Sequence, residues 1–308
     1  MREPNFFIAG GPKCGTTALF SYLKTHPRVF VPWAKEPHYF AEDLPGRREF
    51  RHYEDYLGLF ASSSDHHLAI GEGSALYLYS EVAIQRILER LPDARIIVIL
   101  RNPIEMVPAL HAQWVFGLYE DIENLEEAWS RQSARARGDH IPRFCLEPRL
   151  LQYAAVASQG TQLQRFLSIT PPAQRHVVVY DDFARDTAAV YQHVLSFLGL
   201  PDDGRVDFPR INVRKQLRWP WLQRTICHRR IPGPVRLAGR KVGLHKIHHW
   251  LWKRNQVVSQ KSPPTPEFIA ELRATFRDEI GLTESLLERD LSGWLTGERL
   301  CPAEALHA

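Results

Sequence analysis

A loop that could bind an anion is encoded near the start of the chain, in the stretch GGPKCGTT that begins at Gly10. Gly10 and Gly15 have the spacing of the two glycines in the nucleoside-triphosphate loop G-x-x-x-x-G-K-[ST], and Thr17 takes its Ser/Thr position. Thr16 stands where that motif has its lysine, and the lysine lies earlier, at Lys13. A charge near the apex of the loop predicts a site for an anion shorter than a triphosphate, at the 5′ end of a nucleotide.

The sequence on either side predicts that this loop joins a strand to a helix, as a phosphate loop must. Phe6–Gly10 is a short apolar run, and residues 17–24 have helical spacing. The N-terminus of a helix offers free backbone N–H groups and a partial positive charge. Glycines in the loop let the main chain come close to an anion.

Short apolar runs that alternate with helical patterns predict an α/β fold. Residues 94–100 (ARIIVIL) are typical of a strand covered on both faces, and Arg101 follows them. The alternation predicts a P-loop-like, open, mostly parallel sheet with helices on both faces, in a single domain. Ligands of such sheets bind beyond the carboxyl ends of the strands, so we expect the loop and Arg101 to face one site. Further strands are predicted at 29–31 and 176–180, and helices at 81–91, at 186–199 and from Thr265 onward.

The chain of 308 residues is long enough for a full core, and its basic residues are unevenly distributed. Fourteen lysines and arginines lie between residues 205 and 254 against one acid, Asp207, although the net charge of the chain is only +4. A region this basic predicts an anionic partner. The predicted domain, 1–308, thus has a core (1–204), a basic irregular lid or partner region (205–262) and a C-terminal helical segment (263–300).

The cysteines and the hydropathy of the sequence limit which classes of protein it can belong to. The four cysteines are scattered and form no C-x-x-C pair, which is typical of a reducing compartment rather than of a disulfide scaffold or a zinc site. No apolar run reaches the roughly 18 residues of a membrane span, and no signal-peptide core is present. We therefore expect a soluble, cytoplasmic protein. The sequence does not predict its oligomeric state.

The loop and several later segments together resemble one family. The stretch G-x-P-K-x-G-T-T-A-L, followed by T-H-P and by K-E-P-H-Y-F at 35–40, is similar to the sulfotransferases that use 3′-phosphoadenosine 5′-phosphosulfate (PAPS). The heparan-sulfate type and its bacterial relatives are most similar. R-N-P at 101–103, Y-D-D-F at 180–183 and the tail at 265–294 also fit. The resemblance implies transfer of a sulfuryl group from PAPS to a hydroxyl of a carbohydrate, glycolipid or small natural product, with no metal and no nucleic acid.

The resemblance also implies a donor site. Lys13 and the residues after it would hold the 5′-phosphosulfate, and Arg101 would hold the 3′-phosphate. The family normally has Ser eight residues after that arginine, where this chain has Ala109. The 3′-phosphate contact is therefore expected to be weaker or to come from Arg214 or Lys215. The predicted cofactor-binding residues are Gly11, Pro12, Lys13, Cys14, Gly15, Thr16, Thr17, Arg101, Arg214 and Lys215.

Sulfuryl transfer to an alcohol is an in-line displacement that needs a base, positive charge on the leaving phosphate and positioning. Lys13 suits the leaving group. Glu36 falls on the catalytic glutamate of the heparan-type enzymes, and burial is expected to raise its pKa toward neutrality. His38 matches a neighbouring polar residue and is the reserve base, because its ordinary pKa is already near neutral.

A further segment, G-E-G-S-A-L-Y at 71–77, resembles one that lines the acceptor pocket in the family. The family often has Lys after the glutamate of this segment, where this chain has Gly73. The predicted substrate-binding residues are Lys35, Glu72 and Tyr77.

Three other functions stay open at this level. A P-loop kinase or NTPase is disfavoured by Thr16 in the lysine position and by the lack of a strand-end Asp for magnesium. A non-enzymatic protein could bind nucleic acid or an acidic glycan through residues 205–254, with steeply salt-dependent affinity. A sulfotransferase that binds its nucleotide without turnover is the third, motivated by Ala109.

Overall fold

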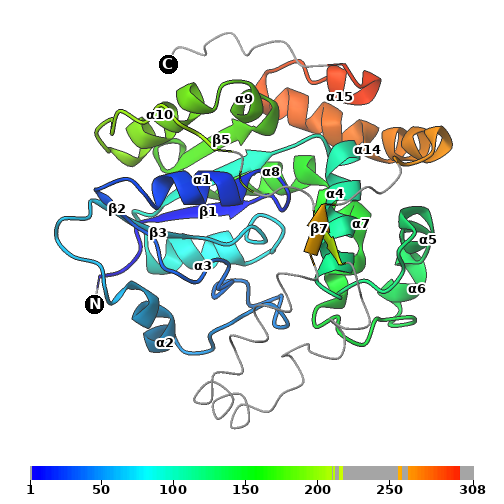
Figure 1. Ribbon diagram of the computed structural model, residues 1–308, viewed down its shortest axis with the longest axis horizontal. Helices are drawn as coiled ribbons and strands as arrows, with labels where there is room; N and C mark the ends of the chain where they lie inside the picture. The colour runs from blue at the N-terminus through cyan, green and yellow to red at the C-terminus, as the bar shows by residue number, and fades with distance from the viewer. Residues whose placement is uncertain (1, 210, 212–214, 218–255, 259–262, 299–308) are drawn as a thin grey trace.

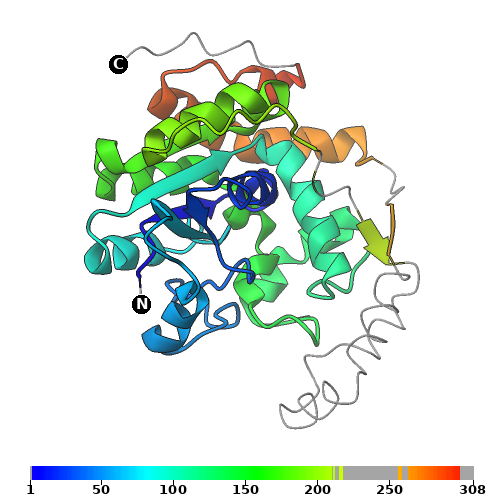
Figure 2. The same cartoon turned by 60° about the vertical axis from the view of Figure 1, so that its left-hand side comes forward.

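The structure is a computed structural model that describes residues 2–209, 211, 215–217, 256–258 and 263–298 (Figure 1). Within these residues the main sheet has five parallel strands in the order β2-β3-β1-β4-β5. A short antiparallel ribbon of β6 and β7 lies apart from it, beyond α4 (Figure 2). The strands are β1 (Phe6–Gly10), β2 (Val29–Phe30), β3 (Ala69–Gly73), β4 (Arg95–Leu100), β5 (Arg175–Val179), β6 (Lys215–Leu217) and β7 (Gln256–Val258).

Helices surround the main sheet. They are α1 (Thr16–Leu23), α2 (Tyr53–Leu57), α3 (Ala83–Arg90), α4 (Pro103–Phe116), α5 (Leu125–Ser130), α6 (Gln132–Ala136), α7 (Tyr153–Ala157), α8 (Gln159–Ile169), α9 (Tyr180–Arg185), α10 (Thr187–Leu198), α14 (Pro266–Leu287) and α15 (Gly293–Thr296). Short 3-10 turns lie at Gly58–Phe60, Pro148–Leu151 and Pro172–Gln174.

The strand order places the loop after β1 at a switch point. From β1 the chain moves through α1 to β2, and from β3 it moves in the opposite direction through α3 to β4. Because such crossovers are right-handed, α1 and α3 cover opposite faces of the sheet, and they lie on either side of β1 in Figure 1. Open parallel sheets bind their ligands where the winding reverses, so the fold itself points to the β1 loop.

The central strands are buried because both faces of the sheet are covered. Every residue of β1, FFIAG, is buried, as is β4 from Ile96 to Leu100. This is the reason that their sequences are continuous apolar runs and not alternating ones. The predicted class, an α/β fold with a parallel sheet surrounded by helices, is confirmed.

The predicted elements agree with the structure to within a residue or two at their ends, as expected for frayed termini. β3 was not among the predicted strands, because its sequence, AIGEG, has two glycines and a charged residue. Of the region at 205–262, predicted to be irregular, the described parts include the paired strands β6 and β7. Arg214 lies outside the described residues, and for Lys215 only its place in β6 is described.

Candidate active site at the carboxyl edge of the sheet

The loop between β1 and α1 has a conformation that leaves helix N–H groups without a protein cap. Gly15 is the N-cap of α1 and contributes no side-chain hydrogen bond there. Its φ of 92° lies in the left-handed region, and a Cβ on it would be 3.2 Å from the ring of Phe183, so both backbone and space favour glycine. The first N–H groups of an α-helix have no intrahelical acceptor. This end of α1 is thus suited to an anion.

Two basic residues, Lys13 and Arg101, lie at this loop. Lys13 has a φ of 63° at the loop's apex, and its Nζ donates to Oε1 of Gln113, on α4, at 3.2 Å. Nη1 of Arg101 donates to the main-chain oxygen of Lys13 at 3.0 Å. Arg101 also pairs with Glu105 at 2.9 Å and lies 4.5 Å from the ring centre of Tyr180. Arg101, which follows β4, therefore contacts the loop that carries Lys13 after β1, and a shared binding site for the two stays a prediction.

The other predicted loop residues have varied surroundings. Gly11, Pro12, Cys14 and Thr16 are buried, and Thr17 is half-buried. Burial raises the pKa of the Cys14 thiol to about 11, against the hydrogen bond from Gln159 and the charge of Arg101. That thiol is protonated at neutral pH and has no thiolate to offer a reaction.

Gln159, the first residue of α8, joins the loop to the end of β4. Its Oε1 accepts from the main-chain N–H of Arg101 at 2.9 Å, and its Nε2 donates to Sγ of Cys14 and Sδ of Met106, each at 3.3 Å. The same Nε2 occupies the space that a Cβ on Gly11 would need. Gln159 thereby fixes the distance between the lysine loop and the arginine.

A second cluster surrounds Glu36, whose side chain is 35% exposed. Nζ of Lys35 donates to Oε1 of Glu36 at 2.7 Å. Nη2 of Arg47 lies 3.9 Å from Oε2, and Nε2 of His38 lies 3.7 Å from it. The second of these distances is too long for a hydrogen bond. Arg47 is held in turn by Tyr119, to whose hydroxyl it donates.

This environment sets the pKa of Glu36 in the direction opposite to the prediction. Burial alone would raise it, but the Lys35 ammonium and His38 outweigh burial and hold the pKa of Glu36 well below its usual range. The expectation of a raised pKa was therefore wrong. The positive charge of Lys35, the preceding residue, has a larger effect on the Glu36 carboxyl than its burial does. Glu36 is an ionised carboxylate at neutral pH.

His38 is completely buried, and both of its ring nitrogens lack a hydrogen-bond partner among the described residues. Burial lowers the pKa of His38, although the Glu36 carboxylate opposes that shift. The imidazole is neutral at pH 7. Its burial favours Glu36 over His38 as the group that meets a substrate.

Glu72 and Tyr77, predicted to contact the acceptor, are both fully buried. Oε1 of Glu72 accepts from the hydroxyl of Tyr77, and Oε2 accepts from that of Ser74, each at 2.7 Å. Burial raises the pKa of Glu72 to about 7, although both hydrogen bonds oppose the shift. Neither side chain is open to an acceptor in this structure. Lys35 is partly exposed and is the one of the three that an acceptor can reach.

The two clusters lie at the same edge of the sheet. β1 and β3 are neighbours, with Ile8 opposite Gly73. The N–H of Ser74 donates to the oxygen of Ile8 at 3.1 Å, and that of Glu36 to the oxygen of Gly73 at 3.0 Å. Lys13 and Glu36 therefore follow or contact the carboxyl ends of adjacent strands.

Sequence reasoning missed Gln113, Gln159 and Arg47. Gln113 had a usable signal, since Glu105, Ala109 and Gln113 are spaced four apart and share one face of α4. Gln159 had none, because it is 58 residues from Arg101.

Two further properties concern the described residues alone. No helix there is long and apolar enough to cross a membrane. No group of three or more His, Cys, Asp or Glu side chains there is placed to hold a metal, and the expectation that no metal is needed stays a prediction.

Comparison with known proteins agrees with this geometry. The profile of the sulfotransferase domain matches residues 3–211. The human bifunctional heparan sulfate N-deacetylase/N-sulfotransferase 2 is 27% identical over 264 residues, which are 79% of this chain and 26% of that protein. Human carbohydrate sulfotransferase 15 is 32% identical over 143 residues, 33% of this chain and 26% of that protein. The chain thus spans about a quarter of the length of these curated relatives.

A solved structure covers nearly the whole chain. The sulfotransferase from Alicyclobacillus acidocaldarius superposes with a TM-score of 0.69 at 26% identity, over 96% of this chain and 99% of that one. The predicted family is confirmed. With a family profile over two thirds of its length and a matching fold, the chain belongs to the sulfotransferase domain family.

Proposed function

We propose that this protein transfers a sulfuryl group from PAPS to a hydroxyl of a carbohydrate, glycolipid or small natural product. The observation that carries the proposal is the hydrogen bond from the Arg101 guanidinium to the main-chain oxygen of Lys13, in the loop before α1. No side chain caps the N-terminus of that helix. The names of the relatives, a heparan sulfate N-sulfotransferase and a carbohydrate sulfotransferase, support a glycan acceptor.

The donor site fits a nucleotide with a phosphate at each side of its ribose. Backbone N–H groups at the start of α1, the Thr17 hydroxyl and Lys13 would hold the 5′-phosphosulfate. Arg101 would hold the 3′-phosphate with the guanidinium edge that Glu105 occupies in this structure. The donor supplies an activated sulfuryl group, and Lys13 stabilises the charge that develops on the departing phosphate.

Glu36 would accept the proton of the acceptor hydroxyl. Its ionised carboxylate is partly exposed and rests against Lys35, which limits its basicity but keeps it unprotonated. A weak base can serve here because proton transfer contributes only part of the acceleration, about 100- to 10,000-fold. Positioning of hydroxyl and sulfuryl group supplies much of the rest.

Calorimetric titration tests the donor. We expect adenosine 3′,5′-bisphosphate to bind without magnesium and ATP with magnesium to bind far more weakly. Lys13→Ala should lower bisphosphate affinity by at least about 10-fold, the loss of one charge-assisted hydrogen bond, while the exposed Lys24→Ala should not. Preferential binding of magnesium-ATP would favour a kinase, and salt-dependent glycan binding that survives Lys13→Ala would favour a non-enzymatic protein.

Transfer of radiolabelled sulfate from PAPS tests the reaction. A glucosaminyl glycan offered with free amines and with acetylated amines separates N- from O-sulfation. Glu36→Gln should lower turnover by about 100- to 10,000-fold with little effect on bisphosphate affinity. A cytoplasmic location is a separate expectation, which fractionation of the native cell would test.

A further inference from the structure

Glu72 is a buried carboxylate without a role in the reaction proposed above. It lies in β3, is fully buried, and accepts hydrogen bonds from Ser74 and Tyr77, while the hydroxyl of the buried Tyr56 also faces it. Burying a charged carboxylate costs free energy unless it is paired or hydrogen-bonded. The hydroxyl groups of Ser74 and Tyr77 can also accept hydrogen bonds, and these connect Glu72 to a neighbouring loop.

Each hydroxyl has one hydrogen and can accept through its lone pairs. Because both hydrogens point at Glu72, the lone pairs are left for the neighbouring loop. Oγ of Ser74 accepts from the main-chain N–H of His38 at 3.0 Å, and the oxygen of Tyr77 accepts from that of Phe40 at 3.3 Å. In its ionised form the carboxylate thus orients both hydroxyl groups so that they face the loop as acceptors.

The loop that they hold carries the proposed base in an unfavourable conformation. Glu36 has a φ of 65° and His38 a φ of 49°, in the left-handed region that residues with a Cβ rarely adopt. The N–H of Glu36 is also bonded, to the oxygen of Gly73 at 3.0 Å. The amides at 36, 38 and 40 are therefore all hydrogen-bonded to the last residue of β3 or to the segment that follows it.

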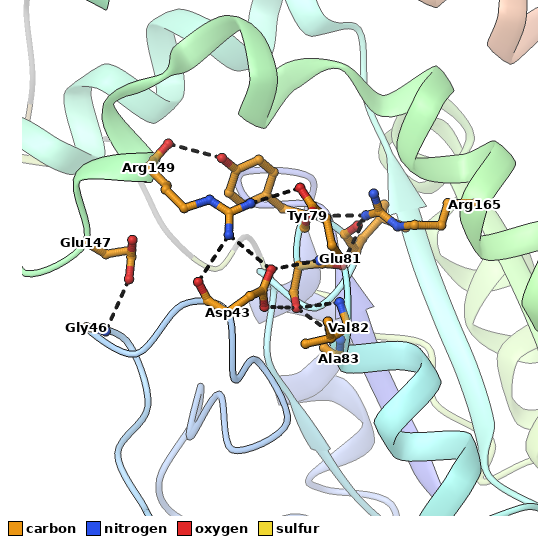
Figure 3. Close-up of polar contacts among 11 residues, drawn as sticks. Asp43, Gly46, Tyr79, Glu81, Val82, Ala83, Glu147, Arg149 and Arg165 are labelled. Atoms are coloured by element: carbon orange, nitrogen blue, oxygen red, sulfur yellow. Dashed lines mark hydrogen bonds and ion pairs between the residues drawn. The ribbon is translucent and has the colours of Figure 1, made fainter. Parts of the chain in front are cut away.

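The C-terminal end of the loop that carries Glu36, at residues 43–46, has its own hydrogen bonds. Asp43 accepts from the N–H of Glu81 at 2.9 Å and from Nη1 of Arg149 at 3.2 Å, and Gly46 donates to Glu147 at 3.2 Å (Figure 3). These contacts reach Glu81, before α3, and residues 147–149, and none of them involves Glu72. The two hydroxyl groups bonded to Glu72 therefore act directly on the loop at residues 38 and 40.

We propose that Glu72 is a positioning residue that, through Ser74 and Tyr77, fixes the loop carrying Glu36 in its reactive orientation. The inference rests on the proposed function, in which Glu36 is the base. It replaces the expected acceptor contact of Glu72 and Tyr77 with a role through the loop.

Hydrogen exchange of the protein without any substrate tests whether Glu72, Ser74 and Tyr77 hold the loop. Ser74→Ala should speed exchange at the amide of His38, and Tyr77→Phe at that of Phe40. Glu72→Gln should speed at least one of the two, because an amide can accept from one hydroxyl but must donate to the other. Tyr191→Phe is the matched control, since Tyr191 is also a buried tyrosine that donates to a carboxylate, that of Asp203. Unchanged exchange at 38 and 40 in all three variants would overturn the proposal.

Kinetics test the chemical part. Glu72→Gln and Tyr77→Phe should lower kcat by about 10- to 100-fold, because a misplacement of about 1 Å can cost ~100-fold. Affinity for adenosine 3′,5′-bisphosphate should stay within about twofold. An equal loss of donor affinity and kcat would show a general structural role and overturn the inference. If the wild type transfers no sulfuryl group to any acceptor, the proposed function fails, while the exchange result still decides whether Glu72 holds the loop.

Should Glu72→Gln fold poorly, Ser74→Ala and Tyr77→Phe each remove one loop contact and leave the carboxylate in place. Their effects on kcat should be smaller than additive when combined, because both act on one loop. Fully additive losses would contradict a shared role.

Discussion

Nη1 of Arg101 donates a hydrogen bond to the main-chain oxygen of Lys13 at 3.0 Å. One guanidinium thus holds the loop for the 5′ group of the nucleotide and faces the proposed 3′-phosphate. Arg101→Ala should therefore weaken binding of adenosine 5′-phosphate as well as of the 3′,5′-bisphosphate, the latter by at least about 10-fold because a charged contact is also lost. Calorimetry with both ligands measures the two effects. Loss for the bisphosphate alone would show that the contact with Lys13 contributes no binding energy.

The space around Gly11 provides a second prediction. A Cβ at this position would overlap Nε2 of Gln159, so Gly11→Ala should lower stability by about 1–3 kcal/mol, the usual range for overpacking. Gln159→Ala removes the obstacle and should recover part of that loss in the double variant. Urea unfolding of the four proteins gives the coupling energy. Simple additivity would mean that the overlap with Gln159 does not cause the loss of stability.

The sequence predicted the parts of this site that are local in the chain. The β1 loop, its lysine and the helix after it are contiguous, and residues 94–100 are continuously apolar because helices cover both faces of β4. Their meeting at one edge followed from the parallel order of the strands.

What the sequence could not predict depends on contacts between distant segments. The pKa of Glu36 is set by the geometry of Lys35 and His38 around it. Glu72 is buried because it lies in β3, and the two glycines of β3 prevented its prediction as a strand. Gln159 reaches the loop only after α8 has packed, and nothing near it in the sequence marks it.

The pairing of Lys35 with Glu36 predicts a pH profile. The lowered pKa of Glu36 should place the acidic limb of kcat/KM well below the ordinary carboxylate range of about 4.3. Lys35→Met removes the cation that holds this pKa down, so the limb should move toward neutral pH. Exposed Lys24→Met, at the end of α1, should leave the limb in place. A profile unaffected by Lys35→Met would exclude Glu36 as the group that titrates.

Glu72 predicts the pH dependence of stability. Its pKa is raised by burial to about 7 in the folded protein, against roughly 4.3 in the unfolded chain. Because the folded value is the higher one, the stability that this group contributes is complete below pH ~4.3 and is lost as pH rises toward 7. Relative to Glu72→Gln, the wild type should lose up to about 4 kcal/mol over this interval.

Urea unfolding at several pH values measures this difference. Tyr77→Phe, which removes a hydrogen bond that lowers the pKa of Glu72, should extend the interval above pH 7. Parallel stability curves for the wild type and Glu72→Gln would contradict the raised pKa.

Position 109 offers the sharpest test of the donor site. Ala109 lies on the face of α4 between Glu105, which pairs with Arg101, and Gln113, which accepts from Lys13. A serine hydroxyl there would point toward the same cations and toward the proposed 3′-phosphate. Ala109→Ser should tighten binding of adenosine 3′,5′-bisphosphate by about 3- to 10-fold, as one added hydrogen bond to a charged group, and leave adenosine 5′-phosphate unchanged. Ala112→Ser, on the same helix but off this row, controls for helix propensity. If Ala109→Ser changes neither affinity, the 3′-phosphate is held away from α4, and Gln113→Ala should then affect the 5′ group alone through Lys13.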